Sequence, residues 1–210
     1  MALRLFAALE PPEAVRRHLA TVQAELRRAL TPEAAARAGR GERGGGHRSP
    51  GAGAVKWVEV GNVHLTLHFL GAAAEEALAG VTAAVRSAAG ASRPLQLEVR
   101  GAGAFPGPQR ARVLWAGVGG EVAPLGELAA ALGALLAPLG FPPEDRPFRP
   151  HLTLGRARDQ RGVAGLGAVL AQLGGGAGVL WQATELVLFR SHLSPAGPRY
   201  EALERARLGG

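Results

Sequence analysis

Hydrophobic residues follow two different periods along the first thirty positions of the chain. Residues 3–9 (Leu-Arg-Leu-Phe-Ala-Ala-Leu) form a nearly continuous apolar run, which predicts a buried β-strand. Pro11 and Pro12 follow, and proline suits the first turn of a helix because that turn leaves its N–H groups unpaired anyway. Apolar residues then recur every three or four positions, which predicts one amphipathic helix to about residue 30; they are Val15, Leu19, Val22, Leu26 and Leu30.

This periodicity stops in the segment 31–54 (TPEAAARAGRGERGGGHRSPGAGA). The segment is rich in Gly, Ala and Arg and has almost no large apolar side chain. Such a composition cannot bury enough surface to fix one conformation, so we predict a flexible loop. Its arginines could touch a polyanion, although a solvated linker is the simpler interpretation, and His47 within it is expected to be inert.

After this segment, strand-like and helix-like patterns alternate to the end of the chain. We expect strands near 55–60, 64–70, 95–99, 112–118, 150–156, 183–190 and 199–205, and helices at 73–89, 121–139 and 159–173. Gly61-Asn62 and the Gly/Pro-rich stretch 101–108 are expected to be turns. Because many connections are too short for a crossover helix, the sequence predicts an α+β fold with antiparallel sheets, not a doubly wound parallel sheet.

Composition narrows the possible classes of protein. The formal net charge of +7 favours polyanionic partners such as RNA or DNA, although a basic surface without a dedicated partner would have the same charge. The chain has no cysteine, which excludes disulfides, thiolate catalysis and cysteine zinc sites. It also lacks a signal-peptide pattern and an uninterrupted apolar run of about 18 residues, so we expect a cytoplasmic protein.

One tetrapeptide occurs twice, as His64-Leu65-Thr66-Leu67 and as residues 151–154. On a strand, successive side chains point to opposite faces. His64 and Thr66 should therefore share one face with His68, and Leu65, Leu67 and Phe69 should share the other. His151 and Thr153 should likewise lie opposite Leu152 and Leu154. If a pseudo-two-fold axis relates the halves, two imidazoles and two hydroxyls meet in one pocket.

Two histidines and two threonines suit phosphoryl chemistry. An imidazole titrates near neutral pH, at about 6.5 when unperturbed, so one can act as a base and the other as an acid. Threonine hydroxyls can hydrogen-bond phosphate oxygens as charge develops on them. A single His-x-Thr segment is usually structural, but two matched copies favour catalysis.

Other kinds of site fit the sequence less well. A zinc site would need His64 and His68 on one ion, but strand rise separates them by roughly 13 Å, and no carboxylate or thiol adjoins either motif. There is no GxGxxG, GxxxxGK[ST] or GxSxG pattern in the required context, which argues against Rossmann, P-loop and serine-hydrolase chemistry.

Five segments together resemble the two-histidine phosphoesterases, and within them the RNA 2′,3′-cyclic phosphodiesterases also called 2′-5′ RNA ligases (the LigT/ThpR group). The segments are RLFAAL…PPE, VKWVEVGNVHLTLHFLG, FPGPQRARVLWAGV, GFPPEDRPFRPHLTLGRAR and LVLFRSHLSPAGPRYEAL. The resemblance implies one domain over residues 1–210, with two pseudo-symmetric lobes of antiparallel sheet, helices outside, and an active-site cleft between the lobes. The loop 31–54 is longer and richer in glycine than is usual for the family.

The resemblance also implies roles for particular residues. His64 would be the general acid that protonates the leaving ribose oxygen, and His151 the general base that activates water. Thr66 and Thr153 would hold phosphate oxygens, and Arg156 would approach the phosphate. Phe105 and Phe148 would line the cleft or stack a base, unless they serve only core packing.

The implied reaction is hydrolysis of RNA 2′,3′-cyclic phosphate ends to 2′-phosphates, without a metal or other cofactor. The substrates would be RNA ends, tRNA fragments among them, and we expect a monomer with no membrane partner. Three alternatives stay open: 2′-5′ ligation of RNA ends in the same pocket, non-catalytic RNA binding, and hydrolysis of small cyclic nucleotides.

Overall fold

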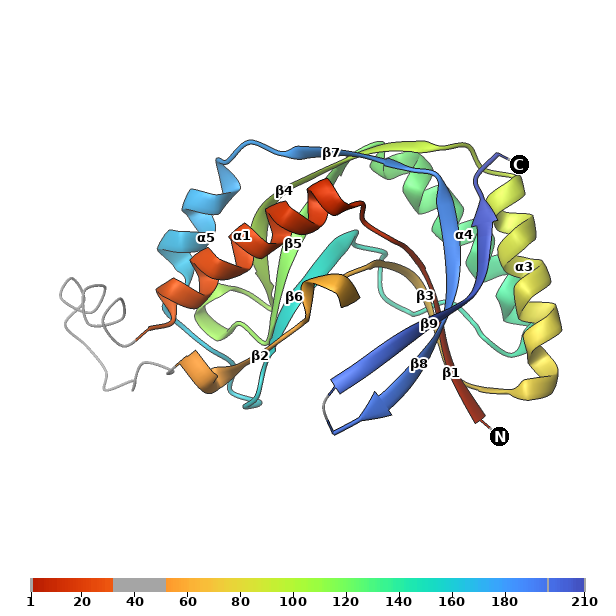
Figure 1. The fold of residues 1–210 in the computed structure, drawn as a ribbon, viewed down its shortest axis with the longest axis horizontal. Helices are drawn as coiled ribbons and strands as arrows, with labels where there is room; N and C mark the ends of the chain where they lie inside the picture. The colour runs from red at the N-terminus through yellow and green to blue at the C-terminus, as the bar shows by residue number, and fades with distance from the viewer. Residues whose placement is uncertain (1, 32–51, 196, 210) are drawn as a thin grey trace.

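The computed structural model describes residues 2–31, 52–195 and 197–209. These residues form two antiparallel sheets (Figure 1), so the predicted α+β class is confirmed. Sheet A has the strand order β3-β1-β8-β9, with β1 (Ala2–Leu9), β3 (Leu65–Ala74), β8 (Glu185–Ser194) and β9 (Gly197–Arg207). Sheet B has the order β2-β6-β5-β4-β7, with β2 (Val55–Trp57), β4 (Leu95–Phe105), β5 (Val113–Gly120), β6 (His151–Ala157) and β7 (Val179–Ala183).

In the described part of the chain, four α-helices cover the outer faces of the two sheets. Helix α1 (Glu13–Ala29) contacts α5 (Gly167–Gly174) and β7 on the side of sheet B. Helices α3 (Leu78–Gly90) and α4 (Val122–Leu136) contact each other and pack on sheet A, as Figure 1 shows. Short 3-10 turns complete the described elements: η1 (Ala52–Ala54), η2 (Val60–Asn62), η3 (Glu75–Ala77), η4 (Pro108–Arg110) and η5 (Ala137–Leu139).

The amphipathic pattern of the first helix is confirmed. Its predicted apolar stripe is fully buried, at Val15, Leu19, Val22, Leu26 and, just past the last turn, Leu30. The helix follows β1 of sheet A but packs beside sheet B. Helix α4 does the reverse, because it follows β5 of sheet B and packs against β3 of sheet A. The two lobes thus exchange helices, and neither lobe is a continuous half of the chain.

The hydrophobic residues that the structure describes form two separate clusters. The large one runs through both lobes and holds the inward-facing leucines and valines of both sheets. The small one lies on the other face of sheet A and consists of Phe6, Ala8, Val187 and Phe189, with Tyr200 packed against them. One sheet face therefore seals the core, while the other supports an aromatic floor.

Several element boundaries differ from the predictions. The expected turn at 101–108 is wrong in its first half, because β4 continues to Phe105. Gly101, with φ +68°, forms a bulge that lets the strand bend without ending. The strand β7 was not predicted, and α5 begins only at Gly167. The predicted loop 31–54 lies mostly outside the described residues; its last three residues form η1.

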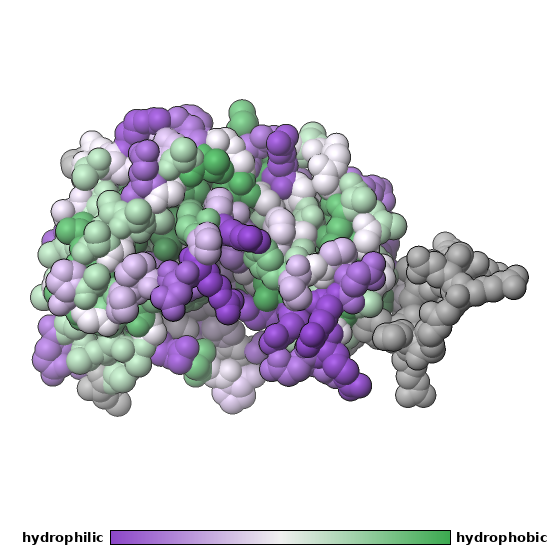
Figure 2. Space-filling model, turned by 180° about the vertical axis from the view of Figure 1, so that it is seen from behind, coloured by the Kyte–Doolittle hydropathy of each residue, from purple (hydrophilic) through white to green (hydrophobic). Residues whose placement is uncertain are grey.

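The helical stretch Val122–Leu139 is long and apolar enough to cross a membrane when judged by length and composition alone. A core helix passes the same test, and α4 buries Leu125, Leu128, Leu132 and Leu136 inside the protein. Figure 2 shows the face turned away from the viewer in Figure 1. Hydrophilic and hydrophobic residues are interspersed there, and hydrophilic side chains gather on both sides of a notch at the lower edge.

Candidate active site

The two His-Leu-Thr-Leu segments lie on strands that contact each other across the boundary between the sheets. His64 directly precedes β3, at the edge of sheet A, and His151 is the first residue of β6 in sheet B. β3 and β6 are in contact. His64 lines a small pocket on the side of sheet A, together with Asn62, Phe189 and Tyr200. We call the space between these two strand faces the groove.

The predicted alternation holds for all four residues of each motif. In both copies the histidine and the threonine are half-buried, and the two leucines are buried. Leu65, Leu152 and Leu154 have no exposed surface at all. The polar face of each segment is therefore turned away from the core, toward the groove.

Beyond the motif, a β-bulge in β3 overturns two of the predicted side-chain positions. The ladder pairs Ala8 with Thr66 and Ala7 with His68, which leaves Leu67 as the extra residue. His68 is therefore not on the catalytic face; it is 7% exposed, in the core beside α4. Phe69 lies instead on the groove side, 53% exposed, with its ring centroid 6.1 Å from that of Phe6.

The strand β6 bulges at the equivalent position. The ladder leaves Leu154 as its extra residue, because it pairs Trp115 with Thr153 and Leu114 with Gly155. Uninterrupted alternation would have turned Arg156 away from His151. After the bulge, Arg156 lies on the same face as His151 and Thr153, and its side chain is exposed.

A buried glutamine stabilises this second bulge. The carbonyl of Leu154 accepts hydrogen bonds from the Val58 amide at 2.9 Å and from the Gln23 side-chain amide at 2.9 Å. Gln23 also donates to the Val58 carbonyl at 2.8 Å, and it is only 4% exposed. Helix α1 thereby adds a second hydrogen bond to the Leu154 carbonyl and links the bulge to the segment that follows β2.

Each motif histidine is anchored in the same way. Nδ1 of His64 lies 2.8 Å from the carbonyl oxygen of Asn62, and Nδ1 of His151 lies 2.7 Å from that of Arg149. A carbonyl can only accept, so Nδ1 must carry the proton and donate it. In the neutral ring Nε2 is then the free acceptor, which leaves that atom of both histidines available for proton transfer.

Aromatic rings fix the planes of both imidazoles. Phe6 stacks on His64 with ring centroids 4.5 Å apart, and Tyr200 meets it edge-on at 5.2 Å. Phe105 meets His151 edge-on at 5.2 Å, so it lines the site beside the second motif. Phe148 is 37% exposed, and the structure records no ring contact for it.

Charges from both sheets act on His64. Burial is the main cause that lowers its pKa, the hydrogen bond to the Asn62 carbonyl raises it, and Arg156 lowers it and Glu10 raises it by smaller amounts. Burial raises the pKa of Tyr200, and Arg156 opposes that shift. Arg156 of sheet B thus lies close enough to influence both His64 and Tyr200 of sheet A.

The described residues include no group of three or more His, Cys, Asp or Glu side chains that could hold a metal ion. His64 and His68 lie on opposite faces of β3. The two histidines therefore cannot bind one zinc ion together, which was the metal site considered from the sequence. His18 lies on α1, and His192 pairs with Glu201 at 2.6 Å on the β8–β9 hairpin.

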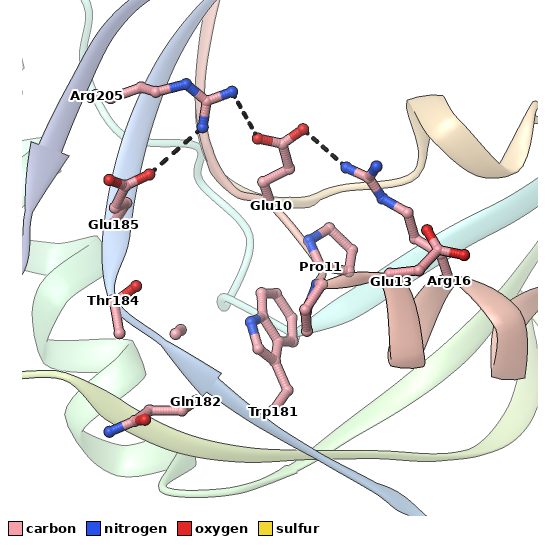
Figure 3. Close-up of a pocket in the computed structure, with 11 residues that line it drawn as sticks. Glu10, Pro11, Glu13, Arg16, Trp181, Gln182, Thr184, Glu185 and Arg205 are labelled. Atoms are coloured by element: carbon pink, nitrogen blue, oxygen red, sulfur yellow. Dashed lines mark hydrogen bonds and ion pairs between the residues drawn. The ribbon is translucent and has the colours of Figure 1, made fainter.

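A second cavity, of about 310 Å³, lies where β1 passes into α1 (Figure 3). Glu10 lines this cavity and pairs with Arg16 and with Arg205, both at 2.8 Å. Arg205 also pairs with Glu185 at 3.4 Å. Glu10 lines the pocket of His64 as well, so this ion network adjoins the groove.

Sequence reasoning missed Tyr200 and Glu10 as parts of the site. Tyr200 is the only tyrosine of the chain and stands in the PRYEAL ending, but its pairing with Ser191 in the β8–β9 ladder decides which face it takes. Glu10 directly follows the first strand, and no local pattern distinguishes it from a surface carboxylate.

The fold and the site define a class: two antiparallel sheets with a His-Leu-Thr-Leu segment on each wall of the groove characterise the two-histidine phosphoesterases. The chain belongs to the 2′-5′ RNA ligase superfamily, whose family model matches residues 53–194. The resemblance seen in the sequence motifs is thereby confirmed.

Individual relatives match over most of their length. A Methanothermobacter thermautotrophicus protein named RNA 2′,3′-cyclic phosphodiesterase is 32% identical over 99% of this chain and 100% of its own. The crystal structure of TT0787 from Thermus thermophilus matches with a TM-score of 0.71, at 30% identity over 99% of this chain and 98% of that one. Escherichia coli LigT complexed with 3′-AMP matches with a TM-score of 0.69, at 25% identity over the full length of both chains.

Proposed function

We propose that this protein is an RNA 2′,3′-cyclic phosphodiesterase that leaves a 2′-phosphate, with His64 as proton donor and His151 as proton acceptor. The observation that carries the proposal is the matched anchoring of the two imidazoles, each holding Nδ1–H on a carbonyl and presenting Nε2. The names of the relatives at 32% and more identity support the same substrate class. In this proposal residues 1–210 work as one two-lobed unit.

The reaction would proceed in one displacement at phosphorus. Nε2 of His151 takes a proton from water as the water oxygen bonds to phosphorus. The bond from phosphorus to the ribose O3′ breaks, and Nε2–H of His64 gives its proton to that oxygen. The products are a 3′-hydroxyl and a 2′-phosphate, and exchange with solvent restores both histidines.

Three further side chains would stabilise the transition state. Thr66 and Thr153 lie on the groove side of their strands, where their hydroxyls can donate to non-bridging phosphate oxygens. Arg156 can pair with the same oxygens through its planar guanidinium. The negative charge of the bound cyclic phosphate also favours the protonated form of His64, against the burial that lowers its pKa.

The direct test is hydrolysis of an oligoribonucleotide with a 2′,3′-cyclic phosphate end, in excess EDTA and without it. We expect equal rates in both and a 2′-phosphate product, identified by phosphorus NMR. His64→Ala and His151→Ala should each lose about 10²- to 10⁴-fold in kcat, the usual contribution of general acid–base catalysis.

His192→Ala is the matched control, because this histidine is half-exposed on the hairpin and pairs with Glu201. It should retain full activity. Full activity in either motif variant, or loss of activity in EDTA that added metal restores, would contradict the proposed mechanism. Binding of RNA without any turnover would favour a non-catalytic RNA-binding protein.

Ligation is a second candidate, favoured by the description of the family model as 2′-5′ RNA ligase. The same groups would run the displacement backwards, with a 5′-hydroxyl in place of water. Mixing RNA fragments that carry cyclic phosphate and 5′-hydroxyl ends would measure the ratio of joined to hydrolysed product.

A further inference from the structure

The groove face of sheet A continues beyond His64 as an aromatic surface. Phe6 and Phe189 stack at 5.1 Å and are 4% and 7% exposed. Phe69 is the next ring along the same face, opposite Phe6 in the β1–β3 ladder, but 53% of it is exposed. A continuous row of rings therefore leads from His64 through Phe6 to an uncovered ring at Phe69.

An arginine without a carboxylate partner stands beside this ring. Arg4 precedes Phe6 by two residues on β1, so both side chains lie on the groove face. It pairs with Ala72 in the β1–β3 ladder, two pairs away from Phe6–Phe69, and a second bulge at Leu70 keeps Ala72 and Phe69 on the same face of β3. Arg4 is exposed and forms no ion pair with any residue that the structure describes, whereas Arg16 and Arg205 are both paired.

The pseudo-symmetry of the motifs gives Phe69 a counterpart. Phe69 and Arg156 each stand five residues after a motif histidine, and the equivalent bulges at Leu67 and Leu154 turn both of them to the groove. One strand thus presents a cation at this position and the other an aromatic ring. These two groups match the two parts of a nucleotide, its phosphate and its base.

We propose that Phe69 and Arg4 form a subsite for the RNA chain on the 5′ side of the cyclic phosphate, in which Phe69 stacks on a base and Arg4 binds a backbone phosphate. Aromatic rings beside cations are the usual means of binding single-stranded nucleic acid, because every base offers a stacking face. The net charge of +7 complements such a ligand. This inference rests on the proposed function for its geometry, since the RNA end must lie in the groove.

The subsite predicts a preference for oligonucleotides over mononucleotides. A nucleoside 2′,3′-cyclic phosphate occupies only the groove around His64 and His151, and it has no second base or phosphate to place on Phe69 and Arg4. A longer RNA reaches both. Removing Phe69 or Arg4 should therefore weaken binding of the oligonucleotide and leave hydrolysis of the nucleoside cyclic phosphate unchanged.

The experiment compares a tetranucleotide and a nucleoside that each end in a 2′,3′-cyclic phosphate. Phe69→Ala should raise KM for the tetranucleotide about 5- to 150-fold, the range expected from loss of 1–3 kcal/mol of stacking. Its kcat, and both constants for the nucleoside, should stay unchanged, and Phe69→Trp should restore tight binding. Arg4→Ala should raise the same KM and lower the salt dependence of binding by about 0.7 in the log–log slope.

Leu180→Ala is the matched control, because Leu180 is 77% exposed on β7 at the far edge of sheet B. The Leu180→Ala variant should leave kcat and KM unchanged for both the tetranucleotide and the nucleoside. Equal losses on both substrates with Phe69→Ala, or an unchanged KM for the tetranucleotide, would overturn the subsite.

A binding measurement separates this inference from the proposed function. Fluorescence anisotropy with a labelled single-stranded oligoribonucleotide ending in a 2′-phosphate needs no turnover. Weaker binding by Phe69→Ala than by Leu180→Ala would support the subsite even if the protein proved inactive. Equal binding by the two variants would reject it even if hydrolysis were confirmed.

Discussion

At the scale of single residues, the two motif histidines share their anchoring but differ in their surroundings. His64 is enclosed by Phe6 and Tyr200, and a carboxylate of the adjoining ion network acts on it. His151 has one edge-on ring and lies at the start of its strand. A proton donor benefits from a nearby carboxylate, because the carboxylate favours the charged imidazolium form.

Glu10→Gln should therefore move the pH dependence of catalysis. Glu10 raises the pKa of His64, so its removal lowers that pKa further. Because the proton donor must be protonated, the alkaline limb of the kcat/KM profile should shift to lower pH. Profiles of kcat/KM against pH for the two proteins measure this shift.

Glu185→Gln is the control for that experiment. It removes the other carboxylate that pairs with Arg205, but Glu185 does not line the pocket of His64. The profile of kcat/KM against pH for Glu185→Gln should coincide with that of the protein without a substitution. An unshifted alkaline limb in Glu10→Gln would mean that Glu10 does not assist His64.

At the scale of elements, the two bulged strands decide which side chains reach the groove. A bulge changes the face of every residue that follows it, as a register slip does. The bulge in β3 places Phe69 in the groove and His68 in the core, and the bulge in β6 places Arg156 in the groove. The sequence shows the four-residue motif but not the bulge, because a bulge depends on how a partner strand pairs.

Gln23 gives a test of how the bulge in β6 is held. Gln23→Ala removes two side-chain hydrogen bonds, a buried one to the carbonyl of Leu154 and a partly buried one to the carbonyl of Val58. We expect the free energy of unfolding to fall by about 1–3 kcal/mol, because two hydrogen bonds are lost at about 0.5–1.5 kcal/mol each. Urea denaturation measures this free energy of unfolding. If the bulge no longer holds Arg156 in place, kcat should fall as well.

The matched control is Gln172→Ala, at an exposed position of helix α5. Its free energy of unfolding should change by less than about 0.5 kcal/mol, as is usual for surface substitutions. If both glutamine variants lose the same stability, the buried amide does not stabilise the strand.

At the scale of the whole molecule, histidines that are wholly or partly buried couple stability to pH. Burial lowers the pKa of His18, His64 and His68 from the ordinary value of 6.5. For His68 the Phe141 backbone and the Glu144 carboxylate act in the opposite direction. Below pH 6.5 the unfolded chain binds protons that the folded protein does not, so unfolding is favoured as pH falls.

The free energy of unfolding should therefore decrease as the pH is lowered from about 7.5 to about 5.5. This range stays above the titration of carboxylates such as Glu121, whose pKa the hydrogen bond from Arg93 lowers to about 2. Urea denaturation at several pH values measures the slope of the free energy of unfolding against pH. His68→Leu should flatten it, because the leucine replaces a buried imidazole whose Nε2 has no hydrogen-bond partner. A stability that does not change with pH would contradict this account.

The exchange of helices between lobes is also a property of the whole molecule. Matching tetrapeptides suggested two halves of the chain, but α1 and α4 each pack beside the sheet that does not contain the preceding strand. The large hydrophobic cluster consequently includes residues of both sheets. Both walls of the groove thus rest on one core.

The sequence by itself determined most of the elements and the alternation of the two motifs. Periods of two and of three to four residues are local, so Leu65, Leu67 and the stripe of α1 could be placed without knowing their partners. The family resemblance also came from the sequence, through the order and spacing of five segments.

Only the tertiary structure decided which side chains complete the site. The faces of Phe69 and Arg156 follow from bulges, and the positions of Glu10 and Tyr200 follow from the strands and helices that surround them. Strand pairing, bulge position and helix exchange arise from contacts between residues far apart in the chain. A pattern read along neighbouring residues carries no information about such contacts.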